Sequence, residues 1–257
     1  MVIAIFSDVH GNFDALEIAL EQMESFSPDV YVCLGDIVGY GPEPVRCLER
    51  VAQIPNCIII KGNHEKILLG ELTTEACSDL GKISSEWTKA NVSKLMIDYV
   101  RSFLEYHIID DFGFYHSFSK EDADFPYLNS LEDILKYMPK DKCKIHFYGH
   151  THRPRVTNIS GEDFYVDIGI RQKLCKDKEY CINVGSIGQM RDSHTDYSFC
   201  VLFTDNNQCE VEIVRGNYDS FKTYCKIRDE MQNRKIADYL IREEERRRNY
   251  ESAYNRR

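Results

Sequence analysis

The stretch VIAIFSDVHGN, residues 2–12, sets the pattern on which the first third of the chain is built. Its first five residues form a continuous apolar run rich in β-branched side chains, which is typical of a strand buried on both faces. Asp8 and His10 follow directly after this run. A helical pattern then extends over residues 12–26. The stretch therefore predicts a strand that delivers a carboxyl group and an imidazole to the loop before a helix.

Alternation of strand and helix continues beyond this first unit. VYVCL at residues 30–34 predicts a second strand, residues 42–54 predict a short helix, and CIIIK at residues 57–61 predicts a third strand. Strands that alternate with helices indicate βαβ units with right-handed crossovers in a mostly parallel sheet.

The remainder of the chain divides into three parts. Residues 65–107 hold several helical patterns without a buried strand, and we interpret them as a helical insertion over the sheet. Short strands separated by turn signals then indicate a second sheet packed on the first. They are expected at residues 113–116, 144–148, 164–167, 180–184, 198–204 and 210–214. The expected division is one domain over residues 1–220 and a charged C-terminal helix with its tail over residues 221–257.

Side chains suited to metal binding follow five of the predicted strands. They are Asp8, His10, Asp36, Asn63, His116, His150 and His152. Sites in an open α/β sheet form outside the carboxyl ends of the strands, so these side chains are expected at one edge. Buried acids and imidazoles are rare unless they share a partner. Oxygen and imidazole ligands suit divalent Mn, Fe, Co, Ni or Zn, and one carboxylate can bridge two such ions.

The order of the motifs is the most specific feature of the sequence. DVH at residues 8–10, GDIVG at 35–39, GNHE at 62–65, the single His116 and GHTH at 149–152 follow one another along the chain. Over residues 1–215 this series resembles the calcineurin-like metallophosphoesterase superfamily. The resemblance implies an α/β fold that is a four-layer α-β-β-α sandwich of two mixed sheets flanked by helices, here with the helical insertion.

The resemblance also implies a dinuclear metal site that hydrolyses phosphate mono- or diesters. Each of two divalent transition metal ions, with manganese favoured, would have three ligands of its own. The first set is Asp8, His10 and His152, and the second is Asn63, His116 and His150. Asp36 would bridge the ions, and metal-bridging hydroxide would attack phosphorus in line. His64 would act on the leaving-group oxygen as a general acid or by stabilising its charge, with a structural role beside the ligands as the alternative.

Two further stretches bear on the substrate. GDIVGYGPEP at residues 35–44 and NVGSIGQMRD at residues 183–192 resemble small prokaryotic phosphodiesterase-like members related to diadenosine tetraphosphate hydrolases. Arg191 would clamp a phosphate, and Tyr40 and Tyr127 would stack on a ring. Asn183 and Ser186 would shape the pocket. Loop hydrogen bonds and packing are the alternative for all five side chains.

Several functions are compatible with these residues. A phosphoesterase for a small phosphate ester or nucleotide is favoured, and a dinucleoside polyphosphate hydrolase is a narrower version of it. A Ser/Thr-type protein phosphatase is disfavoured, because those enzymes carry Asp and Arg where Gly39 and Tyr40 stand. A non-catalytic scaffold on the same fold is disfavoured because His64 and every ligand are present.

Composition limits the expected cellular location and the expected binding partners of the protein. The 257 residues carry a formal net charge of −10, which disfavours binding to nucleic acid. The ten cysteines form no CxxC pair, which indicates reduced thiols and a reducing compartment. The N-terminal apolar run is too short for a signal peptide and no stretch is long enough to span a membrane. We therefore expect a cytoplasmic protein without a membrane partner. Its charged C-terminal helix is either solvated or binds a partner, and it permits a homodimer.

Overall fold

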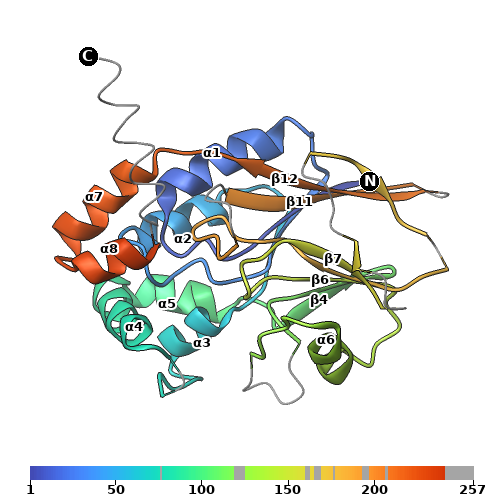
Figure 1. Cartoon of the computed structure of the whole chain (residues 1–257). Coiled ribbons are helices and arrows are strands. Elements are labelled where there is room, and N and C mark those ends of the chain that lie inside the picture. Colours follow the sequence, from blue (N-terminus) through green and yellow to red (C-terminus); the bar gives the residue numbers. More distant parts are fainter. Residues whose placement is uncertain are drawn as a thin grey trace.

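The computed structural model describes residues 1–75, 77–118, 125–159, 163–164, 169–175, 177–192, 197–205 and 208–240. Within these residues two six-stranded sheets pack face to face, and helices cover their outer faces (Figure 1). Each sheet contains both parallel and antiparallel strand pairs. The expected α-β-β-α sandwich of two mixed sheets is confirmed.

The first sheet holds the amino-terminal strands, in the order β3-β2-β1-β11-β12-β9. These strands span Cys57–Ile59 (β3), Val30–Cys33 (β2), Val2–Phe6 (β1), Tyr197–Thr204 (β11), Cys209–Gly216 (β12) and Gln172–Lys173 (β9). β1, β2 and β3 are parallel, as the βαβ pattern predicts. The assignment of all late strands to the second sheet was wrong, because β11 pairs antiparallel with β1 and completes the hydrogen bonding of its second edge.

The second sheet has the order β4-β5-β6-β10-β7-β8. Its strands span Tyr106–Ile109 (β4), Phe112–Tyr115 (β5), Ile145–Tyr148 (β6), Tyr180–Asn183 (β10), Arg155–Asn158 (β7) and Asp163–Phe164 (β8). β4 begins inside the segment that was expected to be helical, because its residues pair antiparallel with β5. Residues 165–167 of the expected strand at 164–167 lie outside the described part of the chain.

Eight helices are described. They span Phe13–Glu24 (α1), Pro44–Ala52 (α2), Asn63–Leu69 (α3), Asp79–Asn91 (α4), Lys94–Arg101 (α5), Leu131–Tyr137 (α6), Ser220–Glu230 (α7) and Arg234–Leu240 (α8). α1 begins where the side chain of Asn12 accepts a hydrogen bond from the backbone N–H of Ala15. In the described residues, no helix is both long and apolar enough to cross a membrane.

β1 explains why the opening apolar run has no polar alternation. Ile3 and Ile5 point into the core between the two sheets, whereas Ala4 and Phe6 point into the core beneath the helices. All four side chains are fully buried. Burying each of the larger ones contributes about 1.5–3 kcal/mol, so the loop that follows β1 starts from a firmly held strand.

The C-terminal helices pack on the body of the protein. α7 and α8 share an apolar cluster with Tyr40 in which Ile227 is fully buried. Lys226 of α7 lies 2.6 Å from carboxylate oxygens of both Asp14 and Glu43. The helical pair lies at the same end of the molecule as α3 and α4 (Figure 1). The rest of the charged tail lies outside the described residues.

Candidate metal centre

The loops after five strands meet at one end of the sandwich. Three of these strands, β1, β2 and β3, run parallel in the first sheet, and the other two, β5 and β6, run parallel in the second sheet. The loops and the first residue of α3 carry all seven predicted ligand residues, namely Asp8, His10, Asp36, Asn63, His116, His150 and His152. The acids and imidazoles among them fall into groups whose ligand atoms lie within 4.8 Å of one another.

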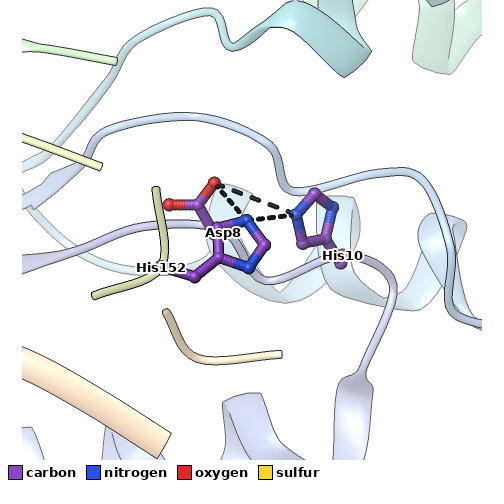
Figure 2. Close-up of side chains that lie close together, drawn as sticks. All are labelled: Asp8, His10 and His152. Carbon is purple, nitrogen blue, oxygen red and sulfur yellow. Dashed lines mark hydrogen bonds and ion pairs between the residues drawn. The ribbon is translucent and has the colours of Figure 1, made fainter. Parts of the chain in front are cut away.

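The first group joins Asp8, His10 and His152 (Figure 2). Asp8 Oδ1 lies 3.2 Å from His152 Nε2 and 3.8 Å from His10 Nε2, and the two Nε2 atoms are 3.1 Å apart. All three residues are buried, and Asp8 Oδ1 has no hydrogen-bond partner among the described residues. The other ring nitrogens face backbone carbonyls of Val38 and Gln189. The Nε2 lone pairs are therefore free to converge with the carboxylate on one cation.

The second group is centred on His116. Its Nε2 lies 3.1 Å from Asn63 Oδ1, 3.2 Å from His150 Nδ1 and 3.4 Å from Asp36 Oδ2. Its Nδ1 lies 2.8 Å from the carbonyl oxygen of Leu34, which orients the ring. Amide, carboxylate and imidazole donors thus converge on a second point, and this donor set also suits a divalent cation.

Asp36 lies between the two groups. Its Oδ2 is 3.4 Å from His116 Nε2 and 3.9 Å from His10 Nε2, so one oxygen faces both. Its Oδ1 accepts a hydrogen bond of 2.8 Å from the backbone N–H of His64. This placement suits the bridging role that the motif implies.

Burial and mutual charge set the protonation of these side chains. Burial lowers the pKa of His10, and it lowers the pKa of His150 to about 3, so both imidazoles are neutral at neutral pH. Burial alone would raise the pKa of Asp36, but His116 lowers it well below its usual range. Burial alone would lower the pKa of His116, but Asp36 raises it to about 9. Neutral imidazoles and carboxylates are the forms that bind metals, so an incoming ion must displace a proton at His116.

The ligand loops are held in strained conformations. Left-handed backbone is found at Asp8 (φ 55°), His10 (φ 49°), Asp36 (φ 53°), Tyr40 (φ 54°), His150 (φ 62°) and His152 (φ 57°). Each such residue costs on the order of 1 kcal/mol or more and persists only where its surroundings enforce it. Hydrogen bonds from the N–H groups of Asp8 and His10 to the carbonyls of Gly35 and Asp36 lock two of the loops together. The ligands are therefore preorganised.

Glu65 organises the centre, and the sequence did not assign it a role. Its buried carboxylate accepts hydrogen bonds from the backbone N–H groups of Asp36 (2.7 Å), Ile37 (2.8 Å), Val38 (3.1 Å) and Gly62 (2.8 Å). It therefore fixes the loop that carries the bridging residue. The acid that ends the GNHE motif was the signal for it.

Asn183 and Ser186, which were predicted at the substrate, do not line the cavity at the centre. Both are fully buried. The Asn183 side chain donates to the carbonyl of Gly149 and to Thr151 Oγ1, and Ser186 Oγ donates to the carbonyl of Asp8. These hydrogen bonds to backbone carbonyls and to Thr151 occupy the polar atoms of both side chains. Asn183 and Ser186 therefore hold the ligand loops in place from behind.

A cavity of about 360 Å³ opens over the centre. Its floor is formed by Asp36, Asn63, His64, His150 and His152. Its walls include the aromatic residues Tyr40, Phe125, Tyr127, Tyr137 and Tyr239, together with Arg191. Tyr40, Tyr127 and Arg191 thus lie where the sequence predicted, whereas Tyr239 comes from α8 and was not anticipated.

His64 lies at the boundary between floor and wall. One of its ring nitrogens lies within 4.8 Å of ligand atoms of His10 and Asp36. Its ring centroid is 5.0 Å from those of both His10 and Tyr40. Gly39 has φ 91°, and a Cβ at that position would overlap the His64 ring. The glycine therefore makes room for this imidazole.

Comparisons with known proteins agree with this geometry. The model of the calcineurin-like phosphoesterase superfamily domain matches residues 1–207. An uncharacterized protein of Methanocaldococcus jannaschii is 33% identical over 232 residues, which cover 88% of this chain and 91% of that protein.

Solved structures show the same likeness. The crystal structure of a metallophosphoesterase from Sphaerobacter thermophilus superposes with a TM-score of 0.80 at 26% identity, covering 93% of this chain and 98% of that one. A hypothetical protein from Pyrococcus horikoshii shares the fold, with a TM-score of 0.73 at 17% identity over 93% of this chain and 97% of that one. The family model covers most of the chain, and the chain therefore belongs to the calcineurin-like phosphoesterase superfamily.

Proposed function

We propose that the protein is a dinuclear metal-dependent phosphoesterase that hydrolyses small phosphate mono- or diesters. The observation that carries this proposal is the pair of ligand groups that share Asp36, whose Oδ2 faces both His10 and His116. When bound, two divalent cations supply Lewis acidity and lower the pKa of a bound water. Manganese is the proposed metal, in keeping with the mixed carboxylate, amide and imidazole ligands.

The ligand roles follow the two groups. One ion would be held by Asp8, His10 and His152, and the other by Asn63, His116 and His150, with Asp36 common to both. The backbone carbonyls behind His10, His116 and His152 fix which nitrogen of each ring faces the centre.

His64 is the proposed proton donor to the leaving-group oxygen. It lines the cavity beside the bridging Asp36, while its backbone N–H is tied to Asp36 Oδ1. A side chain so anchored can protonate or stabilise an oxygen that departs toward Tyr40.

Arg191 is the proposed phosphate clamp. Its Nη2 lies 3.2 Å from Gln189 Oε1, and its Nη1 lies 3.3 Å from the hydroxyl of Tyr127. These contacts hold the guanidinium in the cavity wall, and its planar fork matches two phosphate oxygens.

The other functions have less support. A protein phosphatase of the Ser/Thr type would need an acid at position 39, but a side chain there would overlap His64. A cavity of about 360 Å³ is at the small end of ligand sites, which favours a compact ester over a dinucleoside polyphosphate. The complete ligand set argues against a non-catalytic scaffold. The ten free cysteines support the proposed cytoplasmic location.

Hydrolysis of two chromogenic esters tests the proposed function. Protein loaded with Mn²⁺ is expected to hydrolyse bis(p-nitrophenyl) phosphate, p-nitrophenyl phosphate or both. Chelation should abolish the activity and added Mn²⁺ should restore it. The proposal fails if metal-replete protein hydrolyses neither ester and also leaves a panel of nucleotides and phosphopeptides intact.

A further inference from the structure

One wall of the cavity is a continuous aromatic run that begins at His64. The ring centroid of Tyr40 is 5.0 Å from that of His64, and the ring centroid of Tyr239 is 5.5 Å from that of Tyr40. Tyr40 is 7% exposed, whereas Tyr239 is 39% exposed. Tyr239 is therefore the member of this run whose surface remains available to a bound molecule.

Tyr239 is anchored beside Tyr40 by a backbone hydrogen bond and by the packing of its helix. Its carbonyl oxygen accepts a hydrogen bond of 3.0 Å from Gln189 Nε2, and Oε1 of the same side chain holds Arg191. Ile236 and Ala237 of the same helix are fully buried. The ring of Tyr239 and the cation of Arg191 are thus braced by one shared glutamine.

A second part of the cavity lining is also aromatic. Tyr127 is 52% exposed, and its ring centroid lies 4.4 Å from that of His150. Phe125 lines the cavity beside it. A flat ring entering the cavity therefore has the side chains of Phe125 and Tyr127 available to it as well as Tyr239, beside the ligand groups Asp36, His150 and His152.

Tyr239 differs from the other named residues of the cavity in its place along the chain. The match to the family model ends at residue 207, so α7 and α8 lie beyond it. The ligands and His64 all lie within the matched segment, whereas Tyr239 does not. Helix α8 thus adds the Tyr239 side chain to a cavity whose other lining residues the family domain provides.

We propose that Tyr239 is a specificity-determining residue that stacks on a planar aromatic ring in the leaving group of the ester. The inference rests on the proposed phosphoesterase function and names its substrate class as esters of mononucleotide size. The ring lies on the leaving-group side because the aromatic run starts at His64, the group proposed to protonate the departing oxygen. Arg191, braced by the same glutamine, then reaches the phosphate.

Two substrates that differ in whether they have an aromatic base test the stacking of that base on Tyr239. Adenosine 5′-monophosphate and ribose 5-phosphate both carry the phosphate on the 5-oxygen of ribose, and only the first has a base in its leaving group. Removing a stacking partner costs about tenfold, so Tyr239→Ala should lower the ratio of the two kcat/KM values by about that factor. Tyr239→Phe keeps the ring and should preserve the ratio. Tyr106→Ala, on the exposed strand β4, is the control and should also preserve it. If monoesters are inert, the methyl diesters of both compounds replace them.

Calorimetry on metal-free protein gives a second readout that does not depend on hydrolysis. Tyr239→Ala should weaken the binding of adenosine 5′-monophosphate about tenfold and leave that of ribose 5-phosphate unchanged. The inference is overturned if Tyr239→Ala alters both compounds equally, or alters neither. If the wild-type protein hydrolyses no ester, the proposed function fails, and the calorimetric comparison still decides the ring site.

Discussion

Replacing Asp36 with asparagine is expected to lower the hydrolysis rate by at least about 10³-fold, because bound metals contribute several kcal/mol of transition-state stabilisation. The substitution keeps the size of the side chain but removes the negative charge whose Oδ2 faces both His10 and His116. Each of the two proposed ions would then lose one anionic ligand. Occupancy of both positions should therefore fall together.

The measurement is kcat in Mn²⁺ together with metal content per chain by mass spectrometry. Asp14→Asn is the matched control, since Asp14 belongs to neither ligand group and its largely buried side chain pairs with Lys222 and Lys226 where α1 meets α7. It should leave kcat and metal content unchanged. An Asp36→Asn variant that keeps both ions and the wild-type rate would rule out the bridging role.

Replacing His64 with glutamine is expected to lower kcat by about 10²–10⁴-fold while metal content stays at the wild-type level. The reason is that neither proposed ligand set includes His64, although its ring nitrogen lies near His10 and Asp36 and its backbone N–H donates to Asp36 Oδ1. The loss should depend on the leaving group. An ester of an alkyl alcohol needs a proton on its departing oxygen far more than p-nitrophenolate does, so the alkyl ester should suffer the larger loss.

His107→Gln provides the control for this substitution, because His107 lies on the edge strand β4. It should have no effect on either ester. An equal loss on alkyl and p-nitrophenyl esters would contradict the proton-donor role. A loss of bound metal in His64→Gln would also contradict that role and would indicate that His64 is a ligand.

The sequence predicted most of the strands, though not β4, β7 or β9, and it predicted that the seven candidate ligand residues gather at one edge, because both depend on local pattern. Each ligand follows a buried strand within a few residues, so the end of the strand fixes where Asp8, Asp36 or His116 must lie. The parallel order of β1, β2 and β3 also follows from the helices between them.

What the sequence did not predict depends on contacts between distant segments. Local pattern does not tell which sheet an antiparallel strand such as β11 will join. The many charged residues of α7 indicated a solvated helix, but its Ile227 is fully buried against the body of the protein. The contact of Tyr239 with Tyr40 follows from that packing. For Asn183 and Ser186 the alternative of loop hydrogen bonds describes the structure, because both side chains are buried and bonded to backbone carbonyls.

The number of metal ions per chain tests the central claim most directly. Metal-free protein should be titrated with Mn²⁺ by calorimetry, and the ions retained after dialysis should be counted by mass spectrometry. We predict two ions per chain in the wild-type protein. His10→Ala and His116→Ala should each weaken or empty one position, since these residues belong to different ligand groups. A wild-type protein that binds one ion or none under these conditions, at full activity, would contradict a dinuclear centre.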